Sequence, residues 1–180
     1  MTNEIEKVLY KAVLVFLVKD GKVCLPVKKL KIGAGKRNGF GGGVEKDESW
    51  KNAAAREMVE EAEIKVWPKD LRKIAYLFCR NQTETGLKFT SEIVVFATTF
   101  WLGEPKETKE MGPPEWFQIE QLPQSELMPG DKGWLPETLA EKILRNGKKI
   151  PMVEIWYGPR QETITRPIRM IWLKPSEEKS

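Results

Sequence analysis

The stretch "GFGGGVEKDESWKNAAAREMVEEAEIKV" (39–66) leads from a run of glycines directly into a short segment crowded with acidic side chains. Ser49 is a favourable N-cap residue, and we expect a helix from about residue 49 to about residue 62. Like charges four positions apart on a helix repel each other by roughly a few tenths of a kcal/mol. The acidic cluster therefore needs either full solvation or a compensating positive charge.

At about 100° per residue, this helix places three carboxylates on one stripe, from where they can reach a single point in space. These are Glu57, Glu60 and Glu61, and they lie beside an apolar arc expected to face the core, made of Ala54, Ala55, Met58, Val59 and Ala62. Arg56 is four residues before Glu60, so its guanidinium can hold that carboxylate. The spacing alone leaves two interpretations open, a solvated acidic face or a functional cluster.

Composition and charge narrow the function classes. The chain has 180 residues, 41% hydrophobic and 31% charged, which fits one globular domain over residues 1–180 and argues against intrinsic disorder. The longest apolar run, 12–18, is too short to span a bilayer, and the N-terminus lacks the layout of a secretory signal, so we expect a cytoplasmic protein. A net charge of +4 does not favour duplex nucleic acid as a partner. The sequence leaves the oligomeric state open.

The chain contains no histidine and two distant cysteines, which excludes the usual zinc sites. Cys24 and Cys79 each lie in an apolar stretch, so we expect buried thiols, with a disulfide as the alternative. Any general base must then be a carboxylate, Lys, Tyr or Cys. A carboxylate site without imidazole suits Mg²⁺, with Mn²⁺ as the alternative.

Apolar periodicity and turn residues predict the other elements. We expect strands ending near Val18 and Val27 around a turn at 19–21, a loop at 31–43, strands at 70–80 and 91–103, a polar connection at 104–114, a short strand and turn at 115–123, a helix at 133–147, a hairpin of 151–158 and 162–173, and a disordered tail at 174–180. Trp101, Trp156 and Trp172 lie in the predicted strands and are expected in the core. The order of elements predicts an α/β fold with a mixed sheet flanked by helices.

Six residues around the acidic helix match a known spacing. The pattern G-x5-E-x7-R-E-x-x-E-E is made by Gly42, Glu48, Arg56, Glu57, Glu60 and Glu61, and it resembles the signature of the Nudix hydrolases. Six fixed positions agree by chance in on the order of one window in ten million. The family usually has glycine where this chain has Glu63, a change at the end of the helix.

The resemblance implies the Nudix fold, an α/β/α sandwich, and hydrolysis of a nucleoside diphosphate linked to another group. It also implies that Glu57, Glu60 and Glu61 hold Mg²⁺, with the Gly42 carbonyl and Glu110 as further ligands. This agrees with the chemistry, because pyrophosphate hydrolysis needs charge neutralisation and an aligned water. With no histidine present, we favour Glu61 as the general base, and Arg56 orients the carboxylates.

Three further blocks, 28–44, 110–123 and 127–136, are similar to the animal-type oxidised-purine nucleoside triphosphatases, which hydrolyse 8-oxo-dGTP to the monophosphate and pyrophosphate. The similarity implies a substrate site built from Lys28, Asn38, the glycine-loop residues Phe40, Gly41, Gly42 and Gly43, and Met128, Asp131 and Trp134. In that subgroup the match of Asn38 binds the purine, and Asp131 matches one member of an acidic pair that reads it.

Each of these residues has a simpler interpretation that the sequence leaves open. Asn38 can satisfy loop backbone groups and Asp131 can be a turn residue. Trp134 can be a core residue, while Glu110 and Lys28 can be solvated.

The departures from the subgroup fall in the base pocket. Gly130 replaces the second acid, Met128 replaces a tryptophan, and Arg37, Gly43, Ile32 and Lys11 replace other residues of the loop and pocket. The sequence therefore supports the reaction class more strongly than the substrate. Two alternatives stay open: hydrolysis of a dinucleoside polyphosphate or nucleotide sugar, and a non-catalytic nucleotide-binding module, which the three retained glutamates disfavour.

Overall fold

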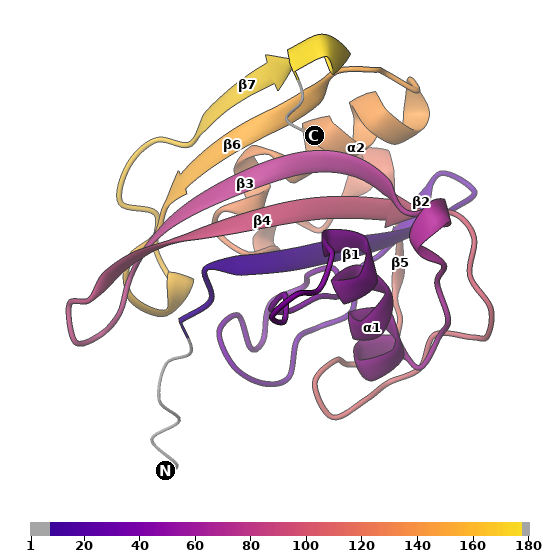
Figure 1. The fold of residues 1–180 in the computed structure, drawn as a ribbon, viewed down its shortest axis with the longest axis horizontal. Helices are drawn as coiled ribbons and strands as arrows, with labels where there is room; N and C mark the ends of the chain where they lie inside the picture. The colour runs from indigo at the N-terminus through magenta and orange to yellow at the C-terminus, as the bar shows by residue number, and fades with distance from the viewer. Residues whose placement is uncertain (1–7, 178–180) are drawn as a thin grey trace.

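A computed structural model describes residues 8–177, and its centre is one mixed sheet of seven strands in the order β5-β2-β1-β4-β3-β6-β7 (Figure 1). The strands are β1 (Lys11–Lys19), β2 (Lys22–Cys24), β3 (Arg72–Gln82), β4 (Lys88–Thr98), β5 (Trp116–Gln118), β6 (Ile150–Trp156) and β7 (Arg169–Leu173). The β1–β4 and β3–β6 pairs are parallel, and the other neighbours are antiparallel.

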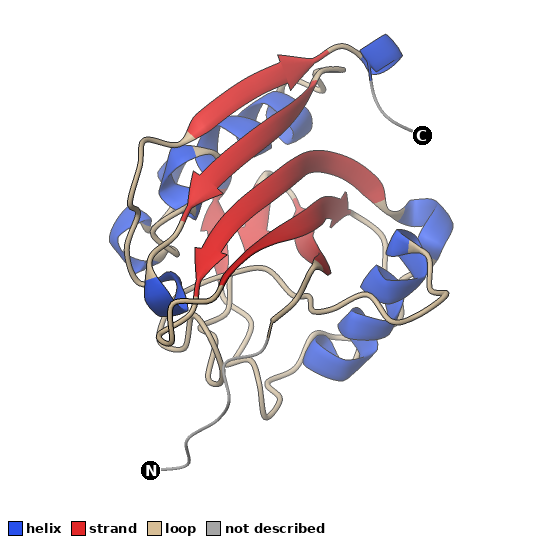
Figure 2. Cartoon of the chain, turned by 60° about the vertical axis from the view of Figure 1, so that its left-hand side comes forward, coloured by secondary structure: helices blue, strands red, loops and turns tan. Residues whose placement is uncertain are grey.

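Strand β1 is apolar on both faces because helices cover both faces of the sheet. Val13, Val15 and Leu17 join the hydrophobic cluster beneath α1 (Trp50–Ala62), whereas Phe16 and Val18 join the cluster beneath α2 (Leu135–Leu139). The two helices lie on opposite sides of the sheet (Figure 2). The predicted α/β/α sandwich with a mixed sheet is therefore confirmed.

Both ends of helix α1 are set by neighbouring residues, Ser49 at its start and Glu63 at its end. The Ser49 hydroxyl accepts a hydrogen bond from the Asn52 backbone N–H at 3.2 Å, the expected N-cap. Glu63 ends the helix in the left-handed conformation, with φ of 55°, and its N–H reaches the Met58 and Val59 carbonyls. This is the position where the family usually has glycine, the residue that adopts such a φ without steric cost.

The buried face of α1 is rotated toward the acidic stripe relative to the expected arc. Val59 is 55% exposed, whereas the buried residues are Ala53, Ala54, Glu57, Met58, Glu61 and Ala62. Two of the carboxylates therefore lie at the edge of the core, and a fully solvated acidic face is excluded for them.

The second predicted helix, at 133–147, lies in the expected part of the chain but is not one continuous α-helix. The chain makes a 3-10 turn at Asp131–Gly133, the short α2, and then a π turn at Ala140–Leu144. The Lys142 ammonium is buried there and donates to the carbonyls of Gly147 and Lys149. These bonds tie the buried ammonium to the chain that leads into β6.

The closing hairpin is wider than predicted, because β7 begins at Arg169 and a long connection, residues 157–168, follows β6. Strand β4 ends at Thr98, so Trp101 lies outside the strand, and Trp101, Trp156 and Trp172 are half-buried rather than core residues. A 3-10 turn at Pro175–Glu177 replaces part of the expected disordered tail, and 178–180 and the N-terminal 1–7 lie outside the described residues.

The expected free, buried thiols of Cys24 and Cys79 are confirmed. Within residues 8–177, no helix is long and apolar enough to cross a lipid bilayer.

Candidate active site

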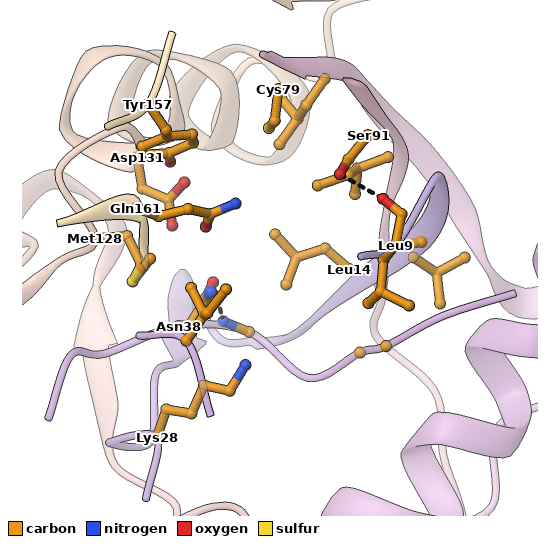
Figure 3. Close-up of a pocket in the computed structure, with 18 of the residues that line it drawn as sticks. Leu9, Leu14, Lys28, Asn38, Cys79, Ser91, Met128, Asp131, Tyr157 and Gln161 are labelled. Carbon is orange, nitrogen blue, oxygen red and sulfur yellow. Dashed lines mark hydrogen bonds between the residues drawn. The ribbon is translucent and has the colours of Figure 1, made fainter. Parts of the chain in front are cut away.

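A cavity of about 170 Å³ opens between the glycine loop, strands β1, β3 and β4, and two loops that follow β5 and β6. Met128, Asp131 and Gln161 lie along one wall, and Leu9, Leu14 and Ser91 along the opposite wall (Figure 3). Asn38 and Lys28 lie at the side nearest the glycine loop. The cavity therefore has one largely polar wall and one largely apolar wall, as expected for a site that binds a flat heterocycle.

The structure brings many of the predicted residues together at this cavity. Its lining includes Lys28, Asn38, Gly41, Gly42, Glu61, Met128 and Asp131. Since Glu61 lies on α1 and Asp131 follows β5, the cavity joins the acidic helix to the loop expected to read a base.

Three predicted substrate-binding residues do not line the cavity. Phe40 is buried in the core beneath α1, where its backbone pairs with Val15 of β1. Trp134 is fully buried and donates its indole N–H to Asp131 Oδ1 at 3.0 Å, so it orients Asp131 from behind. The backbone carbonyl of Gly43 accepts a hydrogen bond from Arg56 instead of facing the cavity.

Arg56 contacts three glutamates and the backbone of the glycine loop. Its guanidinium binds Glu48 at 3.0 Å, Glu57 at 2.8 Å and Glu60 at 3.3 Å, and it donates to the Gly43 carbonyl at 2.8 Å. The charge-assisted contacts to Glu48 and to the carbonyl lock the glycine loop against α1. Arg56 is therefore a positioning residue, and it supplies part of the positive charge that the carboxylate cluster requires.

Glu57 and Glu61 are only 7% and 3% exposed. Burial raises the pKa of Glu61 to about 7, although the Gly41 N–H at 2.8 Å and the charge of Lys28 favour its ionised form. Burial also raises the pKa of Glu57, against the opposing effect of Arg56. Two buried carboxylates close to each other are stabilised by any added cation.

Glycine at position 42 makes room for Glu57, because a Cβ there would collide with the Glu57 carboxylate, which would have to move. The Gly42 carbonyl already accepts a hydrogen bond from the Val13 N–H at 2.9 Å, which leaves one lone pair for another partner. The glycine therefore lets the loop backbone lie directly against the Glu57 carboxylate.

The residues present fit a divalent cation in their chemistry. The donor set consists of carboxylate and carbonyl oxygens, as Mg²⁺ prefers. Arg56 binds Glu57 and Glu60, and Lys31 binds Glu110 at 2.7 Å, so among the described residues no three acidic or thiol groups already converge on one point. Two buried carboxylates, each with a pKa raised by burial, beside a glycine-lined approach are the observation that supports a cation here.

Asp131 has an incompletely satisfied carboxylate inside the cavity wall. Its Oδ1 accepts from Trp134, whereas Oδ2 is buried and has no hydrogen-bond partner among residues 8–177. Burial raises its pKa to about 7. An unpaired buried acceptor costs free energy until a ligand or a proton satisfies it, so Asp131 is suited to a ligand that carries an N–H group.

Lys28 also lines the cavity, where burial lowers its pKa while the charge of Glu61 opposes that shift. Arg37, in contrast, turns away from the cavity and binds Glu115 and Glu126. Its substitution for another residue of the glycine loop therefore adds ion pairs to that loop without changing the cavity lining directly.

Sequence reasoning missed the cavity residues from β3, β4 and the region after β6. These include Leu77, Ser91, Tyr157 and Gln161. The apolar members have the pattern of ordinary strand residues, and Gln161 lies in a polar stretch without a recognisable motif. Only the pairing of β3 with β4 and β6 brings them to one place.

Comparison with known proteins decides the family. The NUDIX domain matches residues 9–138, which is well over half of the chain. The chain belongs to the NUDIX family. Two curated NUDIX relatives named oxidized purine nucleoside triphosphate hydrolase align over 129 residues, or 72% of this chain and 79% of each relative: the Danio rerio protein at 39% identity and the Mus musculus protein at 34%.

Among solved structures, the Mutator MutT protein from Bacillus halodurans superposes with a TM-score of 0.71 at 21% identity. The match covers 90% of this chain and 97% of the MutT chain. At that identity the likeness shows a shared NUDIX fold. It includes elements beyond residue 138, where the domain match ends.

Proposed function

We propose that this chain is a Mg²⁺-dependent diphosphatase that hydrolyses oxidised purine nucleoside triphosphates, such as 8-oxo-dGTP, to the monophosphate and pyrophosphate, and so removes damaged nucleotides from the cellular pool. The names of the two curated relatives support the substrate class. One structural observation carries the proposal. A single cavity is lined both by Asn38 and Asp131, which suit a base edge, and by Gly42 and Glu61, which suit a phosphate chain with its metal.

The size of the cavity favours a single base. Its volume of about 170 Å³ is below the range of roughly 300–1,000 Å³ that encloses a drug-sized ligand. The base therefore enters the cavity, while the sugar and phosphates extend along the glycine loop toward α1.

The polar groups of the cavity suit a purine edge. Asn38 Oδ1 accepts from the Gly39 N–H at 2.8 Å, so the Asn38 amide group is left to donate to an acceptor on the base. Asp131 Oδ2 is an acceptor instead, and it needs either a proton of its own or a hydrogen-bond donor on the ligand. A purine carries donors and acceptors on its edges, and oxidation at C8 adds a carbonyl and an N–H.

The reaction requires a water oxygen to attack phosphorus while the bridging P–O bond breaks and its electron pair leaves with the departing phosphate. We assign Glu61 to accept the proton from that water, because Glu61 alone of the three α1 carboxylates lines the cavity. Arg56 holds Glu57 and Glu60 in orientation, and the Lys28 ammonium offsets phosphate charge. The divalent ion, when bound, neutralises phosphate oxygens and lowers the pKa of coordinated water.

A substrate panel with two variants tests the proposal. Wild-type protein is assayed with normal and oxidised purine triphosphates, dinucleoside polyphosphates and nucleotide sugars, each with Mg²⁺, with Mn²⁺ and with chelator. We expect oxidised purine triphosphates to have the highest kcat/KM and chelator to abolish turnover. Glu61→Gln should lower kcat by at least about 10²-fold without unfolding, while Glu63→Gln, an exposed change at the end of the same helix, should keep it.

Three results would contradict the proposal. Turnover confined to nucleotide sugars or dinucleotides would reject the substrate class. Full activity of Glu61→Gln would reject its assigned role, and a wild type that binds nucleotide without hydrolysing any member of the panel would be a binding module.

A further inference from the structure

The connection after β6 brings two polar side chains into the cavity. Residues 157–168 lie beyond the segment matched by the NUDIX domain, yet Tyr157 and Gln161 both contribute to the cavity lining. Figure 3 shows Gln161 reaching in beside Asp131, on the wall opposite Leu14. We propose that Gln161 is a specificity-determining residue whose side-chain carbonyl accepts a hydrogen bond from the base. This inference rests on the proposed function, in which a purine base occupies the cavity.

A chain of hydrogen bonds fixes which end of the Gln161 amide faces the ligand. The Ser91 hydroxyl donates to the Leu9 carbonyl, which can only accept. Ser91 Oγ must then accept from Asn81 Nδ2, at 3.0 Å, and the other hydrogen of that Nδ2 goes to the Cys79 carbonyl, also at 3.0 Å. Both Asn81 donors are therefore used, and Asn81 Oδ1 is an acceptor.

Gln161 Nε2 donates to this Asn81 Oδ1 at 2.9 Å. The hydrogen-bond network thus determines which end of the Gln161 amide is the nitrogen and which is the oxygen, so the amide cannot be flipped without losing this bond. Its Oε1 accepts no hydrogen bond from any residue between 8 and 177, so the carbonyl is the group that Gln161 offers to a ligand. A fixed acceptor gives more discrimination than a mobile one, because little rotamer freedom is lost on binding.

The backbone at Gln161 is held in an uncommon conformation. Arg160 and Gln161 have φ values of 53° and 58°, both in the left-handed region that residues with a Cβ rarely adopt. Two consecutive non-glycine residues in this region are strained, and strain of this kind persists where the surrounding structure holds it and is often found at binding sites. Here it belongs to the turn that carries the Gln161 side chain toward the cavity.

The polar groups of the cavity together define the ligand. Asn38 has a free donor, Gln161 Oε1 is a fixed acceptor, and Asp131 Oδ2 is an unsatisfied acceptor when ionised. The base edge that fits these groups carries an N–H donor toward Gln161 and a carbonyl acceptor elsewhere. Guanine-type bases, with a lactam and an exocyclic amine, have both, whereas unsubstituted purine has no N–H on its edge.

The test compares Gln161→Met, which keeps length and removes the acceptor, with Gln161→Ala and with Gln121→Met, an exposed control far from the cavity lining. Kinetics are measured with 8-oxo-dGTP and with unsubstituted purine nucleoside triphosphate. Binding of the two monophosphate products is measured by calorimetry, which requires no turnover. Thermal unfolding verifies that each variant is folded.

We expect Gln161→Met to raise KM and the product Kd about tenfold for the 8-oxoguanine nucleotides, with kcat within about twofold and the unsubstituted purine unaffected. A tenfold change is about what the loss of one hydrogen bond produces. Gln161→Ala should show the same selective loss, and Gln121→Met none.

The failures of this inference and of the proposed function are distinguishable. Equal losses for both bases, or no loss, would overturn the role of Gln161 even if 8-oxo-dGTP is hydrolysed. A wild type that binds neither product would overturn it as well. Selective weakening of product binding without any hydrolysis would support the Gln161 contact and reject the proposed reaction.

Discussion

Replacing Asp131 with asparagine should change how the stability of this protein depends on pH. The Asp131 carboxyl is buried, and its pKa is raised from 3.8 to about 7. The folded state therefore binds the proton more tightly than the unfolded state does. The asparagine side chain would keep the acceptor for the Trp134 indole and place an amide group where the protonated carboxyl has its hydrogen, so Asp131→Asn imitates the protonated form.

The direction and size of this change in unfolding free energy follow from the linkage between proton binding and folding. A folded-state pKa above the unfolded value gives stability that is complete below about pH 4 and is lost as pH rises toward about 7. A shift of about 3 units corresponds to about 4 kcal/mol, at about 1.36 kcal/mol per unit. The window from about pH 4.5 to 8 covers roughly 2.5 units below the folded pKa, so within it the wild type should lose about 3 kcal/mol more than Asp131→Asn does.

Urea unfolding across this pH range, in chelator, measures the effect. Glu61 titrates in the same window, but it is present in both proteins and cancels in their difference. Asp47→Asn is the matched control, because Asp47 is exposed and has a positive φ that asparagine tolerates well. If the wild-type and Asp131→Asn curves run parallel over the whole range, then burial does not hold the proton on Asp131 and the reasoning is wrong.

Two further changes test the helix and the glycine loop. Glu63→Gly should raise the free energy of unfolding by about 1 kcal/mol, because glycine adopts the left-handed helix end freely; Glu63→Ala is the control, and equal stability of the two variants in urea titration would contradict the explanation. Gly42→Ala should lower kcat by at least about 10²-fold in a folded protein, because the new Cβ would collide with the Glu57 carboxylate. Gly35→Ala is the control: an added Cβ there meets nothing within 4 Å, so the variant should lose some stability to its φ of 84° but keep kcat. Wild-type activity of Gly42→Ala would show that the close approach is unnecessary.

The parts of the fold that the sequence predicted well are those set by neighbouring residues. Helix α1 begins at the cap that Ser49 provides and runs as far as its spacing indicates. Its rotation was predicted less well, since the wheel placed Val59 inward, whereas contact with the sheet buries Glu57 and Glu61 instead. Local periodicity identifies an apolar arc, but the neighbouring sheet determines which side of that arc is covered.

The parts predicted poorly depend on contacts between distant segments. The start of β7 is set by its register with β6, in which Ile150 pairs with Leu173, and no local turn signal reveals that register. The helix after Trp134 gives way to a π turn, in which buried Lys142 takes its carbonyl partners from the chain that follows. Gln161 likewise lines the cavity in a position held by a hydrogen bond to Asn81, eighty positions earlier, and the sequence gives no sign of that contact.

The α1 carboxylates lie over one face of the sheet, and the loops that carry Asp131 and Gln161 belong to the other half of the molecule. Under the proposed function, the carboxylates that act on the phosphate chain and the base-contacting residues after β5 and β6 therefore belong to different segments, which meet at the cavity together with Asn38 of the glycine loop. Exchanging residues 128–134 and 157–161 between homologous enzymes should accordingly transplant nucleotide preference while the hydrolytic machinery stays untouched, which makes these two short segments the natural targets for engineering.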